Sequence, residues 1–338
     1  MLDASRPVDA SRPIDAAPPK DAAPPTDASD ASSGCYPPPD AAGTPSALLF
    51  GGSDILSCDA GAPCNATTLG DTWVFRSGAW LEQTPHPAPP PRSGHAMTSW
   101  GTGALLFGGY GTNAQNPLLK DTWQWDGQAW HLIPKDGPSA RAYAMLGAVG
   151  GRAVLFGGLD VAGHAFGDTW VWDGCTWTQA EGTSPPARAN AAMTEFEGRV
   201  ILQGGDSDNG TLFSDTWAWD ENGWTQLPVS GPPGTEHVMA ALGSNVVLYG
   251  YLAAMNGTAT FDGTSWTLLP VAGPPLRQAP SMATAGGEVV LFGGIELGQS
   301  ASIGDTWIWN GAAWTQVDIP SPPARWVAAM VSCDSPGP

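Results

Sequence analysis

Two spacings recur along this chain and require a repeated architecture. An arginine, or a residue in its place, precedes a glycine by 16 residues in five copies: Arg92–Gly108, Arg141–Gly157, Arg188–Gly204, Gly234–Gly250 and Arg277–Gly293. The aspartate of an Asp-Thr-Trp motif precedes the next tryptophan by 9 residues, also in five copies: Asp71–Trp80, Asp121–Trp130, Asp168–Trp177, Asp215–Trp224 and Asp305–Trp314. Repeats of roughly 43 to 57 residues built from short apolar segments are typical of radial β-sheet arrays rather than of a single sandwich.

The repeat from Arg188 to Gln226 illustrates how each unit is built. It contains four short segments of strand-forming residues, separated by turn residues and one polar loop: 191–196, 200–203, 216–219 and 224–227. The second segment ends at Gly204-Gly205, and the third alternates with period two in Thr-Trp-Ala-Trp. Pro-rich linkers such as Pro185-Pro186 cannot join a central ladder, so they separate the units. Each repeat therefore predicts four antiparallel strands.

Together these features resemble the kelch repeat, which has an Arg-led first strand, a double glycine after the second, an aromatic-rich third strand and a tryptophan on the fourth. The resemblance covers about Ala47 to Val331. It implies an all-β fold, a six-bladed kelch β-propeller with four antiparallel strands per blade, over residues 35–338. Kelch propellers carry out unrelated functions, so the resemblance alone does not name a ligand.

Blade one is divided between the two ends of this sequence. The N-terminal side supplies Leu48–Gly52, Asp71–Phe75 and Trp80, but no preceding Arg-led strand. The segment Pro323–Met330 has the sequence of that strand. We therefore expect the C-terminal strand to form the inner strand of blade one and to close the ring, which also removes exposed sheet edges.

Most of the 17 tryptophans fall at repeated positions of the motif. One position is the tryptophan of Asp-Thr-Trp, a second lies two residues later on the same sheet face, and a third lies on the fourth strand. Each buried aromatic side chain removes about 150–250 Å² from water. We therefore predict that these side chains pack between blades rather than form a carbohydrate-binding surface.

Five arginines begin inner strands at one mouth of the channel: Arg92, Arg141, Arg188, Arg277 and Arg325. In one interpretation each pairs with the aspartate of its own blade. In the other, the ring of guanidinium groups binds a carboxylate or phosphate ligand in a bidentate manner. Blade five favours the structural pair, because Gly234, Gly250-Tyr251 and Gly257 replace the arginine, the double glycine and the aspartate together.

Residues 1–34 repeat a six-residue Asp/Ala/Pro-rich pattern with few bulky apolar side chains, which predicts a disordered spacer. It resembles the stalks that follow the signal peptide or lipid-anchor cysteine of bacterial exported proteins. We therefore expect an extracytoplasmic protein, secreted or tethered to the cell surface, whose signal lies upstream of Met1. The net charge of −19 argues against nucleic acid and anionic membranes as partners. No apolar run is long enough for membrane insertion.

The five cysteines favour an oxidising compartment. Cys35 precedes the first strand and Cys333 follows the last, so ring closure predicts a Cys35–Cys333 disulfide. Cys58 and Cys64 lie together in the longest loop and predict a second disulfide, which leaves Cys175 over. Reduced thiols in a cytosolic protein are the alternative.

Length variation is concentrated on one face of the predicted ring. The count from the double-glycine position to the Asp-Thr-Trp position varies from 7 to 20 residues, whereas the other spacings change little. Binding sites usually lie in loops on a rigid scaffold. We therefore expect the ligand on this long-loop face, above all at Ser53–Gly70, and then at Tyr110–Lys120 and Asp206–Ser214.

His95 and His237 occupy the same inner-strand position in blades two and five, and Glu236 adjoins His237. With the five arginines, they complete the candidate binding residues at the channel mouth. We expect a monomeric, non-catalytic scaffold that recognises a protein or glycan, without cofactor or metal. The alternative is a carbohydrate-modifying enzyme, similar to galactose oxidase or to a sialic-acid epimerase, whose site lies at that mouth.

Overall fold

A computed structural model describes residues 35–36, 38–39, 44–57, 65–115, 117–252 and 255–335. Tyr36–Pro338 forms one compact unit, separate from Met1–Cys35. The spacer predicted over residues 1–34 lies outside the described residues. Every regular element in the described ranges is a β-strand, which confirms the predicted all-β class. Accordingly, this part of the chain has no helix that could cross a bilayer.

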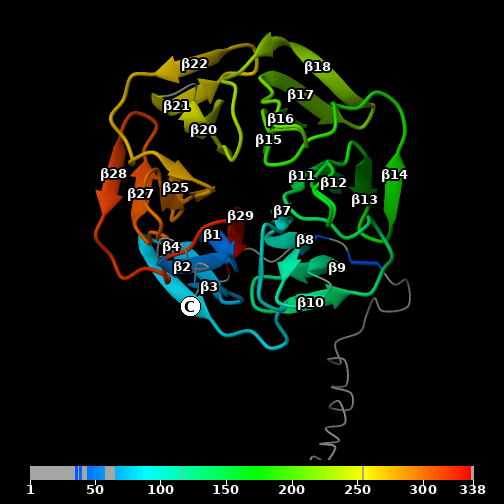
Figure 1. Ribbon diagram of the computed structural model, residues 1–338, viewed down its shortest axis with the longest axis horizontal. Helices are drawn as coiled ribbons and strands as arrows, with labels where there is room; N and C mark the ends of the chain where they lie inside the picture. Colours follow the sequence, from blue (N-terminus) through cyan, green and yellow to red (C-terminus); the bar gives the residue numbers. More distant parts are fainter. Residues whose placement is uncertain are drawn as a thin grey trace, which may run out of the picture. The chain divides into compact units, whose positions relative to one another are not determined.

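Six antiparallel sheets surround a central axis, and each has four main strands (Figure 1). Blade one contains β29 (Ala329–Ser335), β1 (Thr44–Phe50), β4 (Thr72–Arg76) and β5 (Ala79–Gln83). Blade two contains β7 (Ala96–Trp100), β8 (Gly103–Gly111), β9 (Leu118–Trp125) and β10 (Trp130–Ile133), with β6 (Arg92–Ser93) beside β8. Blade three contains β11 (Met145–Val149), β12 (Arg152–Phe156), β13 (Thr169–Trp172) and β14 (Trp177–Ala180).

The remaining three blades repeat this order. Blade four contains β15 (Ala192–Phe196), β16 (Arg199–Gln203), β17 (Asp215–Asp220) and β18 (Gly223–Ser230). Blade five contains β19 (Val238–Leu242), β20 (Asn245–Leu252), β21 (Met255–Phe261) and β22 (Trp266–Leu269). Blade six contains β24 (Ser281–Ala285), β25 (Glu288–Phe292), β27 (Thr306–Trp309) and β28 (Trp314–Val317). Two small pairs complete the fold: β2 (Ser53–Ser57) with β3 (Asn65–Thr68), and β23 (Arg277–Gln278) with β26 (Ile295–Glu296).

The two ends of the chain meet in blade one, as predicted. β29 pairs antiparallel with β1 along the whole of β1, from Thr44 opposite Ser335 to Phe50 opposite Ala329. The register places Ser46 opposite Cys333. The inner strand of blade one therefore comes from the C-terminal end of the chain, and the six-bladed ring is closed by main-chain hydrogen bonds.

The hydrophobic core lies between the blades, in six clusters that each join two neighbouring sheets. At the junction of blades one and two, the ring of Trp130 packs 5.2 Å from that of Phe50, and its Nε1 donates to Thr72 Oγ1 at 3.1 Å. The same inter-blade hydrogen bond occurs at the other five junctions: Trp80–Thr306, Trp177–Thr122, Trp224–Thr169, Trp266–Thr216 and Trp314–Thr258. The fourth-strand tryptophans therefore join the blades, as the repeat positions predicted.

A buried ion pair links three elements of the motif within a blade. In blade four, Arg188 is fully buried, and its guanidinium donates to both carboxylate oxygens of Asp215, at 2.6 and 2.8 Å. It also donates to the carbonyl of Gly204 at 2.9 Å, and Trp217 Nε1 donates to Asp215 at 2.6 Å. The ion pair recurs in four other blades: Arg92–Asp121, Arg141–Asp168, Arg277–Asp305 and Arg325–Asp71. The predicted intra-blade pair is confirmed.

The main chain at the same arginines joins neighbouring blades. The amide of Gly158, the second glycine of blade three, donates to the carbonyl of Arg188 in blade four at 3.0 Å. Gly157 has a φ of 66°, and a Cβ on it would lie 2.3 Å from that carbonyl oxygen. No side chain fits at this distance, and the left-handed conformation also favours glycine. The double glycine is therefore required by the close approach of the next blade.

The structure contradicts one predicted disulfide. Cys35 and Cys175 are each disulfide-bonded, whereas Cys333 is a buried thiol. The predicted Cys35–Cys333 bond is therefore wrong. The predicted Cys58–Cys64 bond lies outside the described residues.

The path of the chain before β1 explains this result. Ring closure does place Cys333 beside β1, where Ser46 Oγ donates to the Cys333 carbonyl at 2.9 Å. However, Tyr36 lies against blade three, where its amide donates to the carbonyl of Gly174. Tyr36 is therefore held beside the turn that contains Cys175.

Removal of the aspartate from one ion pair should strongly destabilise the propeller. In Asp215→Ala the Arg188 guanidinium stays buried without its carboxylate, and breaking such a pair costs about 3–5 kcal/mol. We expect urea titration to report a loss of about 3 kcal/mol in the free energy of unfolding. Asp208→Ala, at an exposed position of the same blade, is the control and should change it by less than about 0.5 kcal/mol. Equal effects of the two substitutions would contradict a structural role for the pair.

The ion pairs also predict sensitivity to acid. Burial is the largest single influence on these carboxyls and opposes ionisation, but hydrogen bonds and charge attraction from arginine, with an indole N–H, outweigh it. They lower the pKa of Asp71, Asp121, Asp168 and Asp215. A carboxyl whose folded-state pKa is depressed adds stability above its unfolded-state pKa, and this stability is lost as pH falls through the folded-state value.

We therefore expect the urea midpoint to fall steeply below about pH 4, the range in which unfolded aspartates titrate. Denaturation followed by tryptophan fluorescence at successive pH values measures it. Asp215→Asn should show a shallower decline than the wild-type protein, because one of the linked carboxyls is absent. A midpoint that stays constant to about pH 2 would show that the pairs do not stabilise the fold.

Candidate functional site

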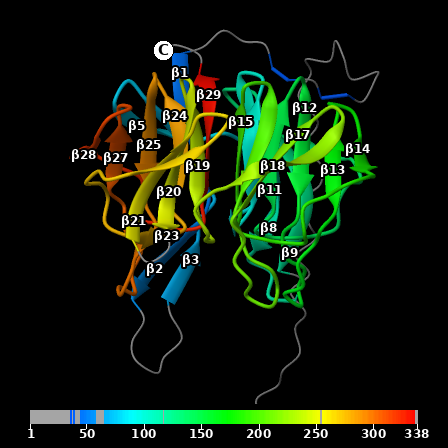
Figure 2. The ribbon, with the colours of Figure 1, turned by 90° about the horizontal axis from the view of Figure 1, so that it is seen from above.

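The central channel has two different ends. We call the end with the connections between second and third strands the loop face, and the end with the hairpin turns the turn face. Figure 2 shows the β2–β3 pair at the loop face, at the opposite end of the ring from the C-terminal end of β29. The inner strands begin at the loop face, so the residues that follow each arginine line the channel mouth there.

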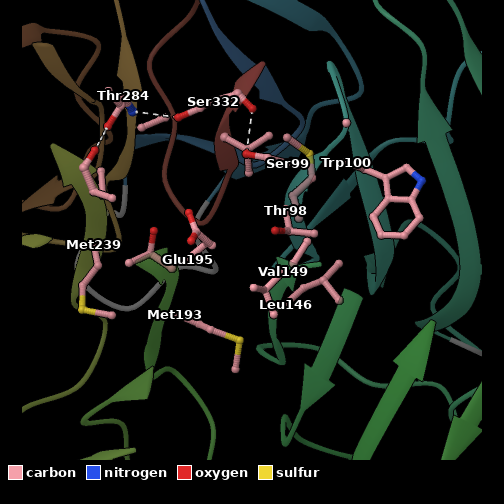
Figure 3. A pocket seen from close by; sticks show the side chains of 18 of the residues that line it. Thr98, Ser99, Trp100, Leu146, Val149, Met193, Glu195, Met239, Thr284 and Ser332 are labelled. Atoms are coloured by element: carbon pink, nitrogen blue, oxygen red, sulfur yellow. Dashed lines mark hydrogen bonds between the residues drawn. The ribbon is translucent and has the colours of Figure 1, made fainter. Parts of the chain in front are cut away.

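At the turn face the channel opens into a cavity of about 590 Å³ (Figure 3). One register position of the six inner strands contributes six of its apolar lining residues: Met97, Leu146, Met193, Met239, Met282 and Met330. Five of these side chains are buried, and Met193 is partly buried; all belong to the inter-blade contacts described above. The repeat therefore explains the methionines as packing residues.

The polar groups of this cavity mostly connect inner strands to one another. Ser99 Oγ donates to the carbonyl of Ser332 at 2.8 Å, and Ser332 Oγ accepts from the amide of Thr284 at 3.2 Å (Figure 3). Thr284 Oγ1 in turn donates to the carbonyl of Ala241 at 2.5 Å. Glu195 is exposed and accepts from the amide of Gly198 at 2.9 Å. These hydroxyls hold blades together, which leaves few of them to orient a ligand.

At the loop face, six residues with left-handed backbone surround the channel mouth. They lie two positions after each arginine or its equivalent: Gly94, Tyr143, Asn190, Glu236, Ala279 and Val327, with φ between 43° and 60°. A series of main-chain hydrogen bonds links these residues around the mouth; for example, the amide of Tyr143 donates to the carbonyl of Gly94 at 2.7 Å. The series continues from the amide of Gly94 to the carbonyl of Val327 at 2.9 Å, and from the amide of Val327 to the carbonyl of Ala279 at 3.2 Å. We call these six residues the mouth ring.

The polar side chains of the mouth ring lie on one side of it. Tyr143, Asn190 and Glu236 come from blades three, four and five, and they line a cavity of about 150 Å³. Asn190 Nδ2 donates to Asp206 at 3.0 Å, and Thr235 Oγ1 donates to the same carboxylate oxygen at 2.6 Å. The carboxylate of Asp206 therefore accepts hydrogen bonds from Asn190 of its own blade and from Thr235 of blade five.

Glu236 differs from the other acidic residues of the motif region. Its side chain is half-buried, and among the described residues no salt bridge or hydrogen bond to its carboxylate is recorded. Burial, with the nearby charge of Asp206, raises the pKa of Glu236. The φ of 57° places this residue in a conformation that non-glycine residues seldom adopt. An unpaired carboxylate is thus held at the mouth by strained backbone.

The two histidines of the predicted site are buried at the base of the same mouth. The His95 ring packs edge-on against Phe50 at 5.5 Å, and neither ring nitrogen has a hydrogen-bond partner within the described structure. Burial, with the positive charge of Arg92, lowers the pKa of His95 to about 3, so the ring is neutral at ordinary pH. His237 lies in the equivalent place in blade five, against Gly204 and Gly250.

The structure divides the predicted site residues into two groups. The five arginines are buried, and their guanidiniums are occupied by aspartates and backbone carbonyls. Phe166 and Phe213 also cover Arg141 and Arg188, each with 3.9 Å between the guanidinium carbon and the ring centroid. His95, Glu236 and His237, in contrast, do lie together at the channel mouth.

Sequence reasoning missed Tyr143 and Asn190 as members of this site, although it included Asp206 in the candidate loop Asp206–Ser214. A signal was present: the position two residues after each arginine holds glycine in blade two and asparagine in blade four, the residues most tolerant of left-handed backbone. Within the described residues, no group of three or more His, Cys, Asp or Glu could hold a metal ion.

The connections of the loop face carry exposed apolar side chains and an excess of acidic ones. Val161, Leu212 and Leu297 lie in the connections of blades three, four and six and are 72%, 51% and 42% exposed. The described parts of these connections also carry a group of acidic residues: Asp54, Asp160, Asp206, Asp208 and Glu296. One basic residue, Lys120, lies on β9 of blade two, where the connection of that blade ends.

Comparison with known proteins identifies the repeat. The family model described as the KLHDC2/KLHL20/DRC7 Kelch-repeats domain matches residues 46–250, which is more than half of the chain. An F-box/kelch-repeat protein of Arabidopsis thaliana is 35% identical over 124 residues, which cover 31% of this chain and 26% of that protein. The chain thus matches about a quarter of the length of this relative. Motif, fold and family model agree, and the chain belongs to the kelch-repeat family.

Proposed function

We propose that this propeller binds a partner protein through its loop face, outside the cytoplasm. The observation that carries the proposal is the contrast between the two parts of the molecule. The ring has buried ion pairs and inter-blade hydrogen bonds, whereas the exposed apolar residues Val161, Leu212 and Leu297 stand on its variable connections. Loops on a rigid scaffold are where binding residues usually lie. Kelch propellers are typically protein-interaction scaffolds, which fits this arrangement.

The chemistry of the loop face favours a basic partner. Its acidic side chains act together with the overall charge of −19, so it attracts a positively charged surface and raises the rate of encounter. Exposed apolar residues among charged ones then supply the contacts that exclude water. Binding should weaken as salt is added, because exposed charges are screened over about 10 Å at 0.1 M ionic strength.

A protein ligand fits these surfaces better than a glycan does. Sugar-binding sites commonly use exposed aromatic faces, but all 17 tryptophans are buried or only partly exposed. The carbohydrate-modifying enzyme considered above would use free arginines at the mouth, and these are occupied by aspartates. A glycan array with the wild-type protein directly tests the alternative hypothesis that the ligand is a glycan.

The extracytoplasmic location is supported by cysteine chemistry. Cys35 and Cys175 are each disulfide-bonded, and disulfides persist mainly in oxidising compartments. The Asp/Ala/Pro-rich composition of residues 1–34 is consistent with a surface spacer.

Polar substitution of the three exposed loop residues should abolish partner capture. We expect the triple variant Val161→Ser, Leu212→Ser, Leu297→Ser to recover its partner at least about tenfold less than the wild type, because burial of each side chain is worth about 1.5–3 kcal/mol. Affinity capture from an extracytoplasmic extract, quantified by mass spectrometry, measures the recovery.

A matched control uses equally exposed apolar residues on the outer strands. Leu81, Leu132 and Leu268 are 40%, 49% and 45% exposed on β5, β10 and β22. Their triple serine variant should retain the same partners to within about twofold. Partners lost equally from both variants, or from neither, would exclude the loop face as the binding surface.

The proposed compartment predicts the oxidation state of two cysteines. When cells of the source organism are quenched with acid and alkylated without reductant, peptides that contain Cys35 and Cys175 should remain unlabelled. After reduction, both should become labelled, because the thiolate is the reactive form. Full labelling before reduction would place the protein in a reducing compartment and contradict the proposal.

A further inference from the structure

We propose that the mouth ring binds a cationic side chain, the ammonium of a lysine or the guanidinium of an arginine, which a partner protein inserts against Glu236. This inference rests on the proposed binding of a protein at the loop face and specifies the group that is recognised there. The site consists of Glu236, Tyr143 and Asn190, with His95 at its base.

The arrangement of donors and acceptors favours a cationic ligand over an anionic one. The guanidiniums near the mouth are buried and bound to aspartates. The amides of Gly94, Tyr143, Asn190 and Glu236 each donate to the carbonyl of the neighbouring ring residue. A carboxylate or phosphate would therefore find few donors at the mouth and would meet the charge of Glu236. A cation would find an acceptor already in place.

Glu236 lacks the positively charged partner that each aspartate of the Asp-Thr-Trp motifs has. Asp121, Asp168, Asp215, Asp305 and Asp71 each pair with a buried arginine. Blade five has Gly234 in place of its arginine, so the nearest equivalent position supplies no cation to Glu236. A half-buried carboxylate without a partner is costly, and an incoming cation repays part of that cost.

His95 is a second, independent feature of this mouth: a buried polar side chain without a hydrogen-bond partner. Its side chain is 94% buried, lines the same cavity, and has two ring nitrogens without a hydrogen-bond partner in the described structure. Buried polar groups are normally satisfied, so an exception calls for a ligand or water. A neutral imidazole carries one nitrogen lone pair that accepts a hydrogen bond from an N–H donor.

Aromatic rings complete the environment that a cation prefers. The ring of Tyr143 covers Gly94, where a Cβ would lie 2.9 Å from Tyr143 Cε1. Tyr110 packs against it at 5.7 Å between ring centroids. A cation beside Glu236 would approach the Tyr143 ring, and cation–π attraction favours lysine and arginine there.

The volume fits one side chain rather than a whole small molecule. Pockets for drug-sized ligands occupy about 300–1,000 Å³, whereas this cavity measures about 150 Å³. It suits a single side chain presented by a protein. The acidic loop connections around it would attract the rest of a basic segment.

The groups around Glu236 fix the pH dependence. Asp206 faces it from the connection after β16 and Tyr143 from the segment before β11. His95 and His237 line the same cavity from the positions just before β7 and β19. Burial, with the Asp206 charge, raises the pKa of Glu236, and the neutral histidine adds no positive charge. A cation binds the ionised carboxylate, so affinity should rise with pH through that pKa and then stay constant.

The test titrates the full-length protein with blocked Gly-Lys-Gly and Gly-Arg-Gly peptides, and follows the backbone amide signals of residues 94, 143, 190 and 236 by NMR. Gly-norleucine-Gly, which has the same aliphatic length without charge, and Gly-Glu-Gly are the ligand controls. We expect saturable shifts at the mouth ring for the two cationic peptides, and an affinity for norleucine at least about tenfold weaker, since a charged hydrogen bond contributes about 1.5–3 kcal/mol.

Two variants distinguish binding of the peptides at Glu236 from nonspecific attraction to the negative charge of the protein. Glu236→Gln keeps the shape of the side chain and should weaken binding of both cationic peptides at least about tenfold. Glu195→Gln removes one negative charge at the opposite, turn-face mouth of the same channel and should leave affinity unchanged. Glu236→Gln should also raise the melting temperature at pH 7, because a carboxyl with a raised folded-state pKa destabilises the fold once it is ionised. A stable Glu236→Gln variant therefore shows that lost binding is not lost folding.

Other results overturn the proposal. Equal binding of norleucine and lysine peptides would make the mouth an apolar contact. Unchanged affinity in Glu236→Gln, or shifts confined to residues outside the mouth ring, would exclude Glu236 as the receptor of the cation. Failure of the loop-face variants to affect partner capture would instead contradict the proposed function, so the two hypotheses fail separately.

Discussion

The close approach of one blade's first arginine to the double glycine of the preceding blade is the contact on which the rest of this propeller depends. The side chain and the main chain of that arginine act in different directions. The guanidinium of Arg188 binds Asp215 and the Gly204 carbonyl within its own blade, while its carbonyl accepts the amide of Gly158 from the blade before. A single residue therefore fixes the inner end of a sheet and the spacing between sheets. This dual function explains why the distance between arginine and glycine does not vary.

Blade five shows which half of this contact is indispensable. Gly234 has no guanidinium, yet its carbonyl still accepts the amide of Gly205 at 2.8 Å, so the main-chain link between blades is kept. A side chain of the neighbouring blade four, Gln203, makes one of the hydrogen bonds that an arginine side chain makes in the other blades. Gln203 Nε2 donates at 3.1 Å to the carbonyl of Pro232, the position that the arginine Nε bonds in the other blades. In blade four, glutamine occupies a position where the other blades have an aromatic residue, so two departures from the repeat compensate each other.

Much of the fold could be predicted from the sequence because each repeat can be compared with the other repeats of the same chain. A residue type that recurs at one position in five or six units reports the geometry of that position, as the Asp-Thr-Trp aspartate and the fourth-strand tryptophan do. The features that were missed are those that do not recur. The predicted Cys35–Cys333 bond failed because it depended on the path of the chain before β1, and no spacing in the repeat encodes that path. The mouth ring was missed because its left-handed backbone is occupied by residues as different as Gly94, Tyr143 and Val327.

The same logic connects the irregular blade with the proposed site. Blade five lacks both members of the ion pair, because Gly234 and Gly257 stand in place of its arginine and its aspartate. Glu236 lies two residues after Gly234, and its backbone is held in a left-handed conformation by the hydrogen bond from its amide to the carbonyl of Asn190. Strain and an uncompensated carboxylate both reduce stability, and both persist only where the surrounding ring is rigid enough to impose them. The ion pairs that stabilise the other five blades thus make it possible for blade five to present an acidic group to a ligand from outside.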